Sequence, residues 1–472
     1  MCQRGSNATE LRAPRDNYVA SRIPEARRAN SGAIRSRAVL TNLEVLSLRP
    51  NRTRKLPRQT TAALALWLSA LLAFSCQRDR SEQKAASAPL SADERALGAR
   101  ALSNYADVAF QTYGDAAETA RLLLSQVDRF LAAPSAQSLA ETRAAWSTAR
   151  RPYQQSEAFR FYDGPIDRVE TQINTWPIDE SYVEAGNPAA KPGIIEDVAA
   201  YPLISPALIG KLNASEGETS ISTGYHVIEF LLWGRDTRAD GPGDRPFTDY
   251  VTARSNAATP DEASQAPKSV AARRGRYLRA AAELLLGQLV EVRDAWAPGV
   301  ADNYRSKFLR LPPSEALGLA IKGMGSLSGP ELSGERLTVP YETKDQENEH
   351  SCFSDTTQLD LAHDALGIEN VCLGRYRREG AAPLSGPGLC DLIALRDPAL
   401  AQRLKQELSA SVQATQRIPA PFDQAILGPD SAPGRQAIHS AIEALQRQTE
   451  TLAKVAAIFD IRLSLADPRA AR

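Results

Sequence analysis

The sequence predicts an all-α protein, and three of its features support that prediction. Ala, Leu, Glu, Gln and Arg are plentiful, while aromatic residues make up only 6% of the 472 residues, a composition that favours helix. Apolar residues recur at helical spacing in several long segments, and no stretch of useful length alternates apolar and polar residues as a strand does. A chain of this length can form two or more domains, each with its own core.

Residues 1–58 form a basic N-terminal segment. They carry 13 Lys and Arg against 4 Asp and Glu, and they show no sustained apolar periodicity, which is typical of disorder. Residues 77–472 hold 43 basic and 52 acidic residues and no run of Lys or Arg. This mildly acidic body lacks the charge pattern of a nucleic-acid-binding protein, so we expect no nucleic-acid partner.

Residues 59–76 have the pattern of an export signal. Basic Arg54–Arg58 precedes the apolar run Thr61–Phe74, whose 14 residues fall short of the roughly 20 that span a bilayer as a helix. Phe74 stands where a bacterial lipobox usually has a small residue, and Cys76 follows as the expected lipidation site. Ordinary signal cleavage nearby is the alternative. The extension before the signal indicates either disorder or a start site placed too early.

A polar tether at 77–94 is expected to lead into a first helical bundle at 95–254. Its first helix has an apolar face formed by Leu123, Val127, Phe130 and Leu131. Pro134 ends that helix, and a second helix is expected from about Ser138 towards Ser156.

The next segment, Phe159–Glu184, is rich in aromatic residues and carboxylates. Gly164-Pro165 and Trp176-Pro177 prevent one continuous helix. Such a segment either lines a functional site or serves as a packed connecting loop, and both remain open. Its candidate site-lining residues are Asp163, Asp179 and Glu180.

The segment S-T-G-Y-H-V-I-E-F-L-L-W-G-R-D is expected to form a short buried helix. Ser222 or Thr223 can cap its start, and Gly234 ends it. His226 and Glu229 stand three residues apart, so their side chains share one face. Because the helix is apolar almost all round, these two side chains need partners. The partner is either a metal ion or, in a hydrogen-bonded pair, the other side chain.

A long polar break, formed by Gly241–Pro246 and Ser255–Ser269, marks the expected boundary to a second helical bundle at 270–466. The first helix of that bundle has a buried side formed by Tyr277, Ala281, Leu284, Leu285, Leu289, Val292 and Trp296. The glycines of Gly323–Gly329 follow no strand and precede no Gly-Lys-Ser/Thr, so they indicate close helix approach or a bend instead of a phosphate loop.

A second polar cluster, Asp345–Asp360, is followed by the segment Pro421–Ile426 and a last helix. The cluster adds the candidate site-lining residues Glu349, His350 and Asp355. Each half of the chain thus pairs long helices with a segment of aromatic, proline and carboxylate residues. This likeness suggests two four-helix-bundle-like domains related by internal duplication.

Three cysteines, Cys352, Cys372 and Cys390, lie in the body of the chain. An exported protein can form one disulfide among them and keep one free thiol. The spacing does not indicate which two are paired. Without C-x-x-C spacing, neither a zinc knuckle nor a thioredoxin-like site is expected.

His226 and Glu229 do not complete a zinc-peptidase motif. Both H-E-x-x-H and H-x-x-E-H need a second histidine, and Phe230 follows Glu229 here. The other histidines, distant in sequence, are His350, His363 and His439. No G-x-S-x-G elbow or catalytic cysteine arrangement is present either. A site for a hard cation needs no second histidine, because carboxylates and one imidazole can supply its ligands.

Five segments stand in order along the chain: F-R-F-Y-D-G-P-I-D, N-T-W-P-I-D-E, S-T-G-Y-H-V-I-E-F-L-L-W-G, G-P-G-D-R-P-F-T-D-Y and E-H-S-C-F-S-D. Together they closely resemble the imelysin-like family and, within it, the iron-regulated protein A branch. The resemblance covers about residues 95 to 465. Gly224, His226 and Glu229 match the G-x-H-x-x-E motif of the family.

The resemblance implies an exported, all-helical protein of two bundle-like domains with the motif near their shared cleft. It implies bacterial iron uptake, with iron or another divalent metal at His226 and Glu229. The leading hypothesis is a periplasm-facing lipoprotein, or a periplasmic protein, that binds metal through this pair and interdomain carboxylates. Its partners would be envelope iron-uptake components, and only the lipid would contact the membrane.

Two other functions remain open at this point. The family also carries a metallopeptidase label, and a metallopeptidase would use the same pair; the incomplete motif weighs against an enzyme. The third candidate is a structural or partner-binding envelope lipoprotein without metal, in which the pair is a buried hydrogen bond.

Overall fold

The computed structural model describes residues 89–186, 191–238, 241–252, 269–378, 380–461 and 463. All of them belong to one compact unit, Lys84–Arg472. The basic segment 1–58, the expected signal at 59–76 with its Cys76, and residues 77–88 of the tether lie outside the described residues. Within the described ranges, no helix combines the length and apolarity needed to cross a membrane.

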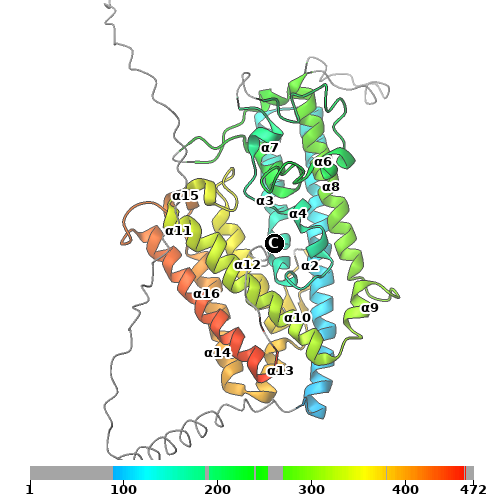
Figure 1. Ribbon diagram of the computed structural model, residues 1–472, viewed down its shortest axis with the longest axis vertical. Coiled ribbons are helices and arrows are strands. Elements are labelled where there is room, and N and C mark those ends of the chain that lie inside the picture. The colour runs from blue at the N-terminus through cyan, green and yellow to red at the C-terminus, as the bar shows by residue number, and fades with distance from the viewer. Residues whose placement is uncertain are drawn as a thin grey trace, which may run out of the picture. The chain divides into compact units, whose positions relative to one another are not determined.

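Helices dominate the described chain, as predicted (Figure 1). The longer ones are α2 (Ala92–Ala132), α3 (Ala136–Ser156), α8 (Val270–Ala295), α10 (Pro313–Ser326), α12 (Thr357–Leu373), α14 (Pro398–Gln416) and α16 (Pro433–Ile458). The shorter ones are α4 (Glu170–Ile173), α5 (Glu180–Val183), α6 (Pro206–Leu212), α7 (Gly224–Trp233), α9 (Tyr304–Phe308), α11 (Val339–Thr343), α13 (Leu389–Arg396) and α15 (Phe422–Ala425).

Tighter and wider turns complete the secondary structure. Single 3₁₀ turns form at Glu157–Phe159, Ile166–Arg168, Phe247–Tyr250 and Gln346–Asn348. A π-helix, Leu327–Thr338, follows α10 directly. The strands β1 (Arg375–Tyr376) and β2 (Leu384–Ser385) pair antiparallel, with Tyr376 opposite Leu384. The all-α prediction missed this pair because two-residue strands are too short to show a period of two.

Local sequence explains where the long helices begin and end. Ser91 caps α2 by accepting a hydrogen bond from the Glu94 N–H at 3.1 Å, and the Glu94 carboxylate accepts from the Ser91 N–H at 2.6 Å. This reciprocal arrangement satisfies two N–H groups that the first turn leaves free. Pro134 stands between α2 and α3 and prevents their fusion, as predicted.

The described helices pack in two sets, which contact each other through α3 and α12. α2 packs against α3 and α8, and α8 also contacts α6 and α7. α14 packs between α12 and α16, which lie beside it in Figure 1, and α12 also contacts α3. The predicted boundary at 255–269 separates α7 from α8, which contact each other. The division into two bundles and the internal duplication stay predictions.

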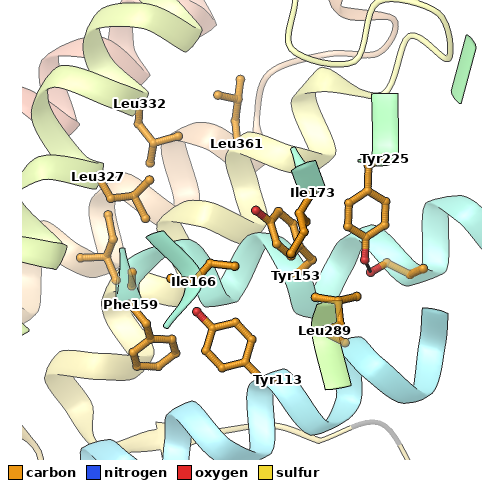
Figure 2. Close-up of a cluster of buried hydrophobic side chains, with 14 of the residues drawn as sticks. Tyr113, Tyr153, Phe159, Ile166, Ile173, Tyr225, Leu289, Leu327, Leu332 and Leu361 are labelled. Atoms are coloured by element: carbon orange, nitrogen blue, oxygen red, sulfur yellow. Dashed lines mark hydrogen bonds between the residues drawn. The ribbon is translucent and has the colours of Figure 1, made fainter. Parts of the chain in front are cut away.

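Aromatic side chains fix α7 against α3 in the core. Figure 2 shows Tyr153 and Tyr225 side by side, and their ring centroids are 5.0 Å apart. The Tyr225 hydroxyl donates to the Ala149 carbonyl at 3.1 Å, and the indole N–H of Trp146 donates to the Tyr225 carbonyl at 3.0 Å. These bonds satisfy polar atoms that burial would otherwise leave without partners.

Two expectations about small residues are confirmed. A Cβ atom on Gly323 would lie 2.5 Å from the Ala158 carbonyl oxygen, so the glycine-rich segment allows close approach of backbones. Cys372 and Cys390 form a disulfide that joins the end of α12 to α13, and Cys352 keeps a free thiol. The structure thus assigns the pair that the sequence left open.

Candidate functional site

Gly224 begins α7, and both its backbone and its neighbours require glycine. Its φ of 89° lies in the left-handed region, and a Cβ atom there would lie 2.4 Å from the Ile173 carbonyl oxygen. Thr223 is the N-cap residue, but its hydroxyl donates to the Gln172 carbonyl at 2.9 Å. The predicted side-chain cap is therefore wrong, because the hydroxyl ties α7 to the segment before it. Gly234 ends the helix as predicted, with a φ of 79°.

His226 and Glu229 meet on one face of α7, as their spacing predicts. The Nδ1 atom of His226 lies 2.9 Å from Oε2 of Glu229. Both side chains are buried, with 3% and 0% of their surface exposed. The pair therefore sits in an environment of low polarity, where each group depends on its partners.

The second carboxyl oxygen of Glu229 is held by the loop that precedes α12. Its Oε1 accepts hydrogen bonds from the Ser354 N–H at 2.9 Å and from the Ser354 hydroxyl at 2.6 Å. Burial raises the pKa of Glu229 to about 8, so this carboxyl group is largely protonated at neutral pH. Burial and the nearby Arg150 charge lower the pKa of His226 well below its usual value, so the imidazole is neutral.

A second histidine–carboxylate pair lies beside the first. Nδ1 of His350 lies 2.9 Å from Oδ2 of Asp360, and the Arg150 guanidinium donates to the same carboxylate at 2.5 Å. Although burial opposes it, the Arg150 charge holds the pKa of Asp360 well below its usual range. Burial and the Arg336 charge lower the pKa of His350 to about 4. Asp360 is therefore ionised, and His350 is neutral.

A pocket opens beside the two imidazole rings. The ring centroids of His226 and His350 are 4.9 Å apart at an interplanar angle of 68°, and Trp176 stands edge-on to His350 at 5.2 Å. About 280 Å³ is free of atoms, open solvent included. The lining residues are Trp176, Pro177, Ile178, His226, Glu347, Glu349, His350, Cys352 and Phe353.

Two buried side-chain atoms of the described pocket lining have no hydrogen-bond partner. They are Nε2 of His226 and Oε1 of Glu349, and both are buried. Nε2 of His350, in contrast, lies 3.4 Å from the Asn174 amide nitrogen. An imidazole nitrogen and a carboxylate oxygen are both atom types that bind iron and zinc in proteins. Among the residues that the structure describes, however, no group of three or more His, Cys, Asp or Glu side chains is arranged to hold a metal ion.

The sequence-predicted site residues divide into two groups. His226, Glu349 and His350 line the pocket. Glu229 contacts His226 from the same helix, which Gly224 begins. Asp355 is 5% exposed in the turn before α12 and is one residue from the Ser354 that binds Glu229.

The other three predicted residues serve local structure. The Asp163 side chain is exposed in a turn where its φ is 62°. Asp179 caps α5 by accepting from the Ser181 N–H at 2.9 Å. Glu180 forms an ion pair with Arg235 at 2.8 Å.

Sequence reasoning missed three residues that organise the site. Arg150 lies on α3 and is 2% exposed, Asn174 follows α4, and Ser354 lies in the loop before α12. Asn174 and Ser354 had a signal, because they belong to the N-T-W-P-I-D-E and E-H-S-C-F-S-D segments. Nothing in the sequence distinguishes Arg150 from an exposed arginine of an amphipathic helix.

Comparisons with known proteins agree with the helical fold. A solved structure described as a candidate iron-regulated protein A precursor, from Parabacteroides distasonis, matches with a TM-score of 0.59 at 20% identity. The match covers 79% of this chain and 96% of that one. An imelysin-like protein from Psychrobacter arcticum matches with a TM-score of 0.56 at 13% identity, over 80% of this chain and 99% of that one. These structures establish an imelysin-like fold.

Sequence comparison gives the family. Iron-regulated protein A of Synechococcus elongatus is 24% identical over 354 residues, which are 73% of this chain and 82% of that protein. The imelysin (peptidase M75) family profile matches residues 109–452. That range holds every residue of the pocket and most of the described helices. The chain therefore belongs to the imelysin family.

Proposed function

We propose that the chain is an exported, iron-associated protein of the cell envelope that binds a divalent metal ion at Nε2 of His226. The similarity to a relative named iron-regulated protein A supports the association with iron. The size of the pocket supports an ion as ligand. Only about 20 Å³ of it can be occupied by the centre of a water-sized sphere, which leaves room for a water molecule or an ion.

One observation carries this proposal. Nδ1 of His226 is engaged by Glu229, while Nε2 of the same ring is buried at the pocket without a partner. A metal-binding imidazole typically uses one nitrogen for the ion and donates from the other to a carboxylate, which fixes the ring. Glu229 thus orients His226, and its remaining oxygen holds Ser354. The sequence had suggested that both motif residues are ligands.

Metal binding at Nε2 requires a proton on Nδ1 of His226, between that ring and Glu229. Nε2 of His226 offers a lone pair only when Nδ1 carries the proton. Nδ1 then donates to Glu229, which has to be a carboxylate to accept. Because the pKa of Glu229 is raised to about 8, binding is expected to release the carboxyl proton at neutral pH.

His226 contributes only one ligand atom, so others must complete the coordination. Oε1 of Glu349 is a candidate on the pocket wall, since it is buried and without a partner. The described side chains form no complete set of three, so water or a small chelating ligand supplies the rest in this proposal. A metal bound as a chelate fits a protein that takes up or passes on iron.

Export and lipid anchoring are part of the proposal. The charged and apolar pattern at 59–76 supports a signal, and Cys76 supports a lipid anchor. The buried disulfide between Cys372 and Cys390 supports an oxidising compartment such as the periplasm. Envelope iron-uptake components would be the partners, and the lipid alone would contact the membrane.

Calorimetric titration of the purified protein with Fe²⁺ under anaerobic conditions, and with Zn²⁺, tests this function. We expect His226→Ala to abolish binding and Glu229→Gln to weaken it by about 10–100-fold, as loss of an orienting carboxylate does. His439→Ala is the control, because the His439 side chain is 56% exposed on α16. Equal binding by the wild type and His226→Ala would contradict the proposal.

The same variants separate the two other functions. A metallopeptidase requires chelator-sensitive cleavage of an unfolded protein that Glu229→Gln abolishes. A structural lipoprotein without metal requires that His226→Ala lowers the melting temperature while no metal binds to the wild type.

A further inference from the structure

A second pocket opens where α8 and α9 meet the 3₁₀ turn Ile166–Arg168. About 200 Å³ of it can be occupied by the centre of a water-sized sphere, against about 20 Å³ in the pocket beside His226. A single water molecule needs roughly 10–15 Å³ of such space, and an apolar cavity of about 150 Å³ binds benzene. The second pocket therefore has room for a small organic molecule. The two pockets share no lining residue.

One wall of the second pocket is built by the segment F-R-F-Y-D-G-P-I-D, which supplies Pro165 and is followed directly by Arg168. The Asp167 carboxylate accepts hydrogen bonds from three backbone N–H groups of this segment. They belong to Phe161, Tyr162 and Gly164, at 2.9, 3.2 and 2.8 Å. These bonds fix the turn that carries Pro165 and Arg168. No residue of the segment lines the pocket beside His226, so its contribution to a binding surface is the second pocket.

The other wall comes from the end of α8 and from α9. The Asn303 side-chain amide donates to the Ala297 carbonyl at 2.8 Å, and its Oδ1 accepts from the Ser306 N–H at 2.9 Å. The Tyr304 ring stands edge-on to the buried Trp296, with ring centroids 4.9 Å apart. These contacts order the wall before a ligand arrives, which lowers the entropy cost of binding.

The lining combines apolar side chains with an excess of positive charge. Its apolar residues are Pro165, Val292 and Ala295. Arg168 and Lys307 are exposed cations, and among the described residues no carboxylate forms an ion pair with either of them. Glu291 is the one acidic residue of the lining. Burial raises the pKa of the Tyr304 hydroxyl above its usual range, so this group stays protonated and can donate a hydrogen bond. The lining thus favours an anion, although acidic residues outnumber basic ones in residues 77–472.

We propose that the second pocket binds a small organic carboxylate whose apolar body is about the size of one ring. Arg168 and Lys307 bind the carboxylate group, because a guanidinium and an ammonium both donate charge-assisted hydrogen bonds to an anion. The apolar residues and the Tyr304 ring cover the body of the ligand. Glu291 repels a second anionic group, which favours a monocarboxylate. This site goes beyond the metal site proposed at His226 and does not depend on it.

Ligand-observed NMR titration of the purified protein with benzoate and with benzylamine tests the proposal. The two probes carry the same ring with opposite charges. We expect benzoate to bind and benzylamine not to bind, because its ammonium group would face two cations. Arg168→Gln and Lys307→Gln should each weaken benzoate binding roughly 3–10-fold, since each removes one charge-assisted hydrogen bond at an exposed position. Because both side chains are exposed, neither variant should change the melting temperature.

Two further variants separate the pocket from the general surface charge. Ala295→Phe fills the apolar part of the pocket, keeps both cations and should abolish benzoate binding. Lys454→Gln is the matched control, because it removes an exposed lysine of α16 that does not line the pocket. It should bind benzoate as the wild type does, and so should His226→Ala, which loses only the proposed metal site.

Three results would overturn the proposal. They are no binding of benzoate to the wild type, undiminished binding by the variants of Arg168, Lys307 or Ala295, and binding of benzylamine as tight as that of benzoate.

Discussion

The imidazole rings of His226 and His350 lie edge to face, 4.9 Å apart, and Nδ1 of each ring lies 2.9 Å from a carboxyl oxygen. The two carboxyl groups differ in charge. Asp360 is ionised because Arg150 is bound to it, whereas burial raises the pKa of Glu229 to about 8. His350 is thus held permanently by a charge, and His226 is held by a group that can still exchange a proton. Of the two rings, His226 is therefore the one whose carboxyl partner can gain or lose a proton near neutral pH.

Gly224→Ala is expected to destabilise the protein by about 2 kcal/mol or more, since it adds left-handed strain and a steric clash. The added Cβ atom would lie 2.4 Å from the Ile173 carbonyl oxygen at a φ of 89°. Gly114→Ala on α2 is the control, because a Cβ atom there meets nothing within 4 Å. That variant should gain about 0.5–1 kcal/mol. Urea unfolding measures both changes, and equal effects would contradict the prediction.

Asp360→Asn is expected to cost about 3–5 kcal/mol, because it leaves the buried Arg150 guanidinium without its counter-charge. Both side chains are 3% exposed. Asp128→Asn removes a carboxylate from an exposed pair with Arg279, whose side chains are 48% and 49% exposed, and should cost less than about 1 kcal/mol. If chemical denaturation gives the same loss for both variants, the buried pair is not the stabilising feature described here.

In the presence of a chelator, stability is expected to fall as pH rises from about 5 to 9. The folded-state pKa values of Asp355, Glu229 and Glu349 are about 7, 8 and 9, all above the values near 4 of an unfolded chain. Over this range the folded state binds more protons, so each group lowers the free energy of unfolding by up to about 1.4 kcal/mol per pH unit. Denaturant midpoints measured across the range give the slope.

Glu349→Gln should make this decline shallower, and Glu443→Gln, which changes an exposed residue of α16, should not. Below about pH 4 the direction reverses. Arg160 and Arg336 hold the pKa of Glu157 at about 2 despite its burial, so its contribution is lost as pH falls through that value. A stability that rises steadily from pH 5 to 9 would contradict the prediction.

Replacing both Cys372 and Cys390 by serine is expected to destabilise the protein by about 3 kcal/mol, because the disulfide closes a loop of 18 residues. A reducing agent should have a similar effect on the wild type and none on the double variant. Thermal or urea unfolding under reducing and oxidising conditions checks this. An unchanged midpoint of the wild type in reductant would show that the disulfide contributes little.

The helices of this fold were predictable because their signals are local. Proline and capping residues mark the ends of α2 and α3, and Gly234 marks the end of α7. The contact between His226 and Glu229 was predictable for the same reason, since helical spacing brings residues three apart onto one face.

The rest of the site depends on contacts between distant segments. Asp360 lies 210 residues from Arg150, and no spacing rule relates them. The segment Phe159–Glu184 supplies Trp176 to the pocket, whereas its Asp179 only caps a helix. The composition of this segment indicated a possible functional site. It did not predict which residues face inward, because that depends on the packing of α7 against α3 and α4.

The central claim is that Nε2 of His226 binds the metal while Nδ1 donates to Glu229. Nitrogen NMR of protein labelled with ¹⁵N-histidine, recorded with and without Zn²⁺, tests it most directly, and His226→Ala assigns the resonances. We predict that Zn²⁺ shifts the Nε2 signal of His226 and leaves Nδ1 protonated. Resonances of His226 that do not respond to Zn²⁺, or a shift that shows the metal on Nδ1, would contradict the account.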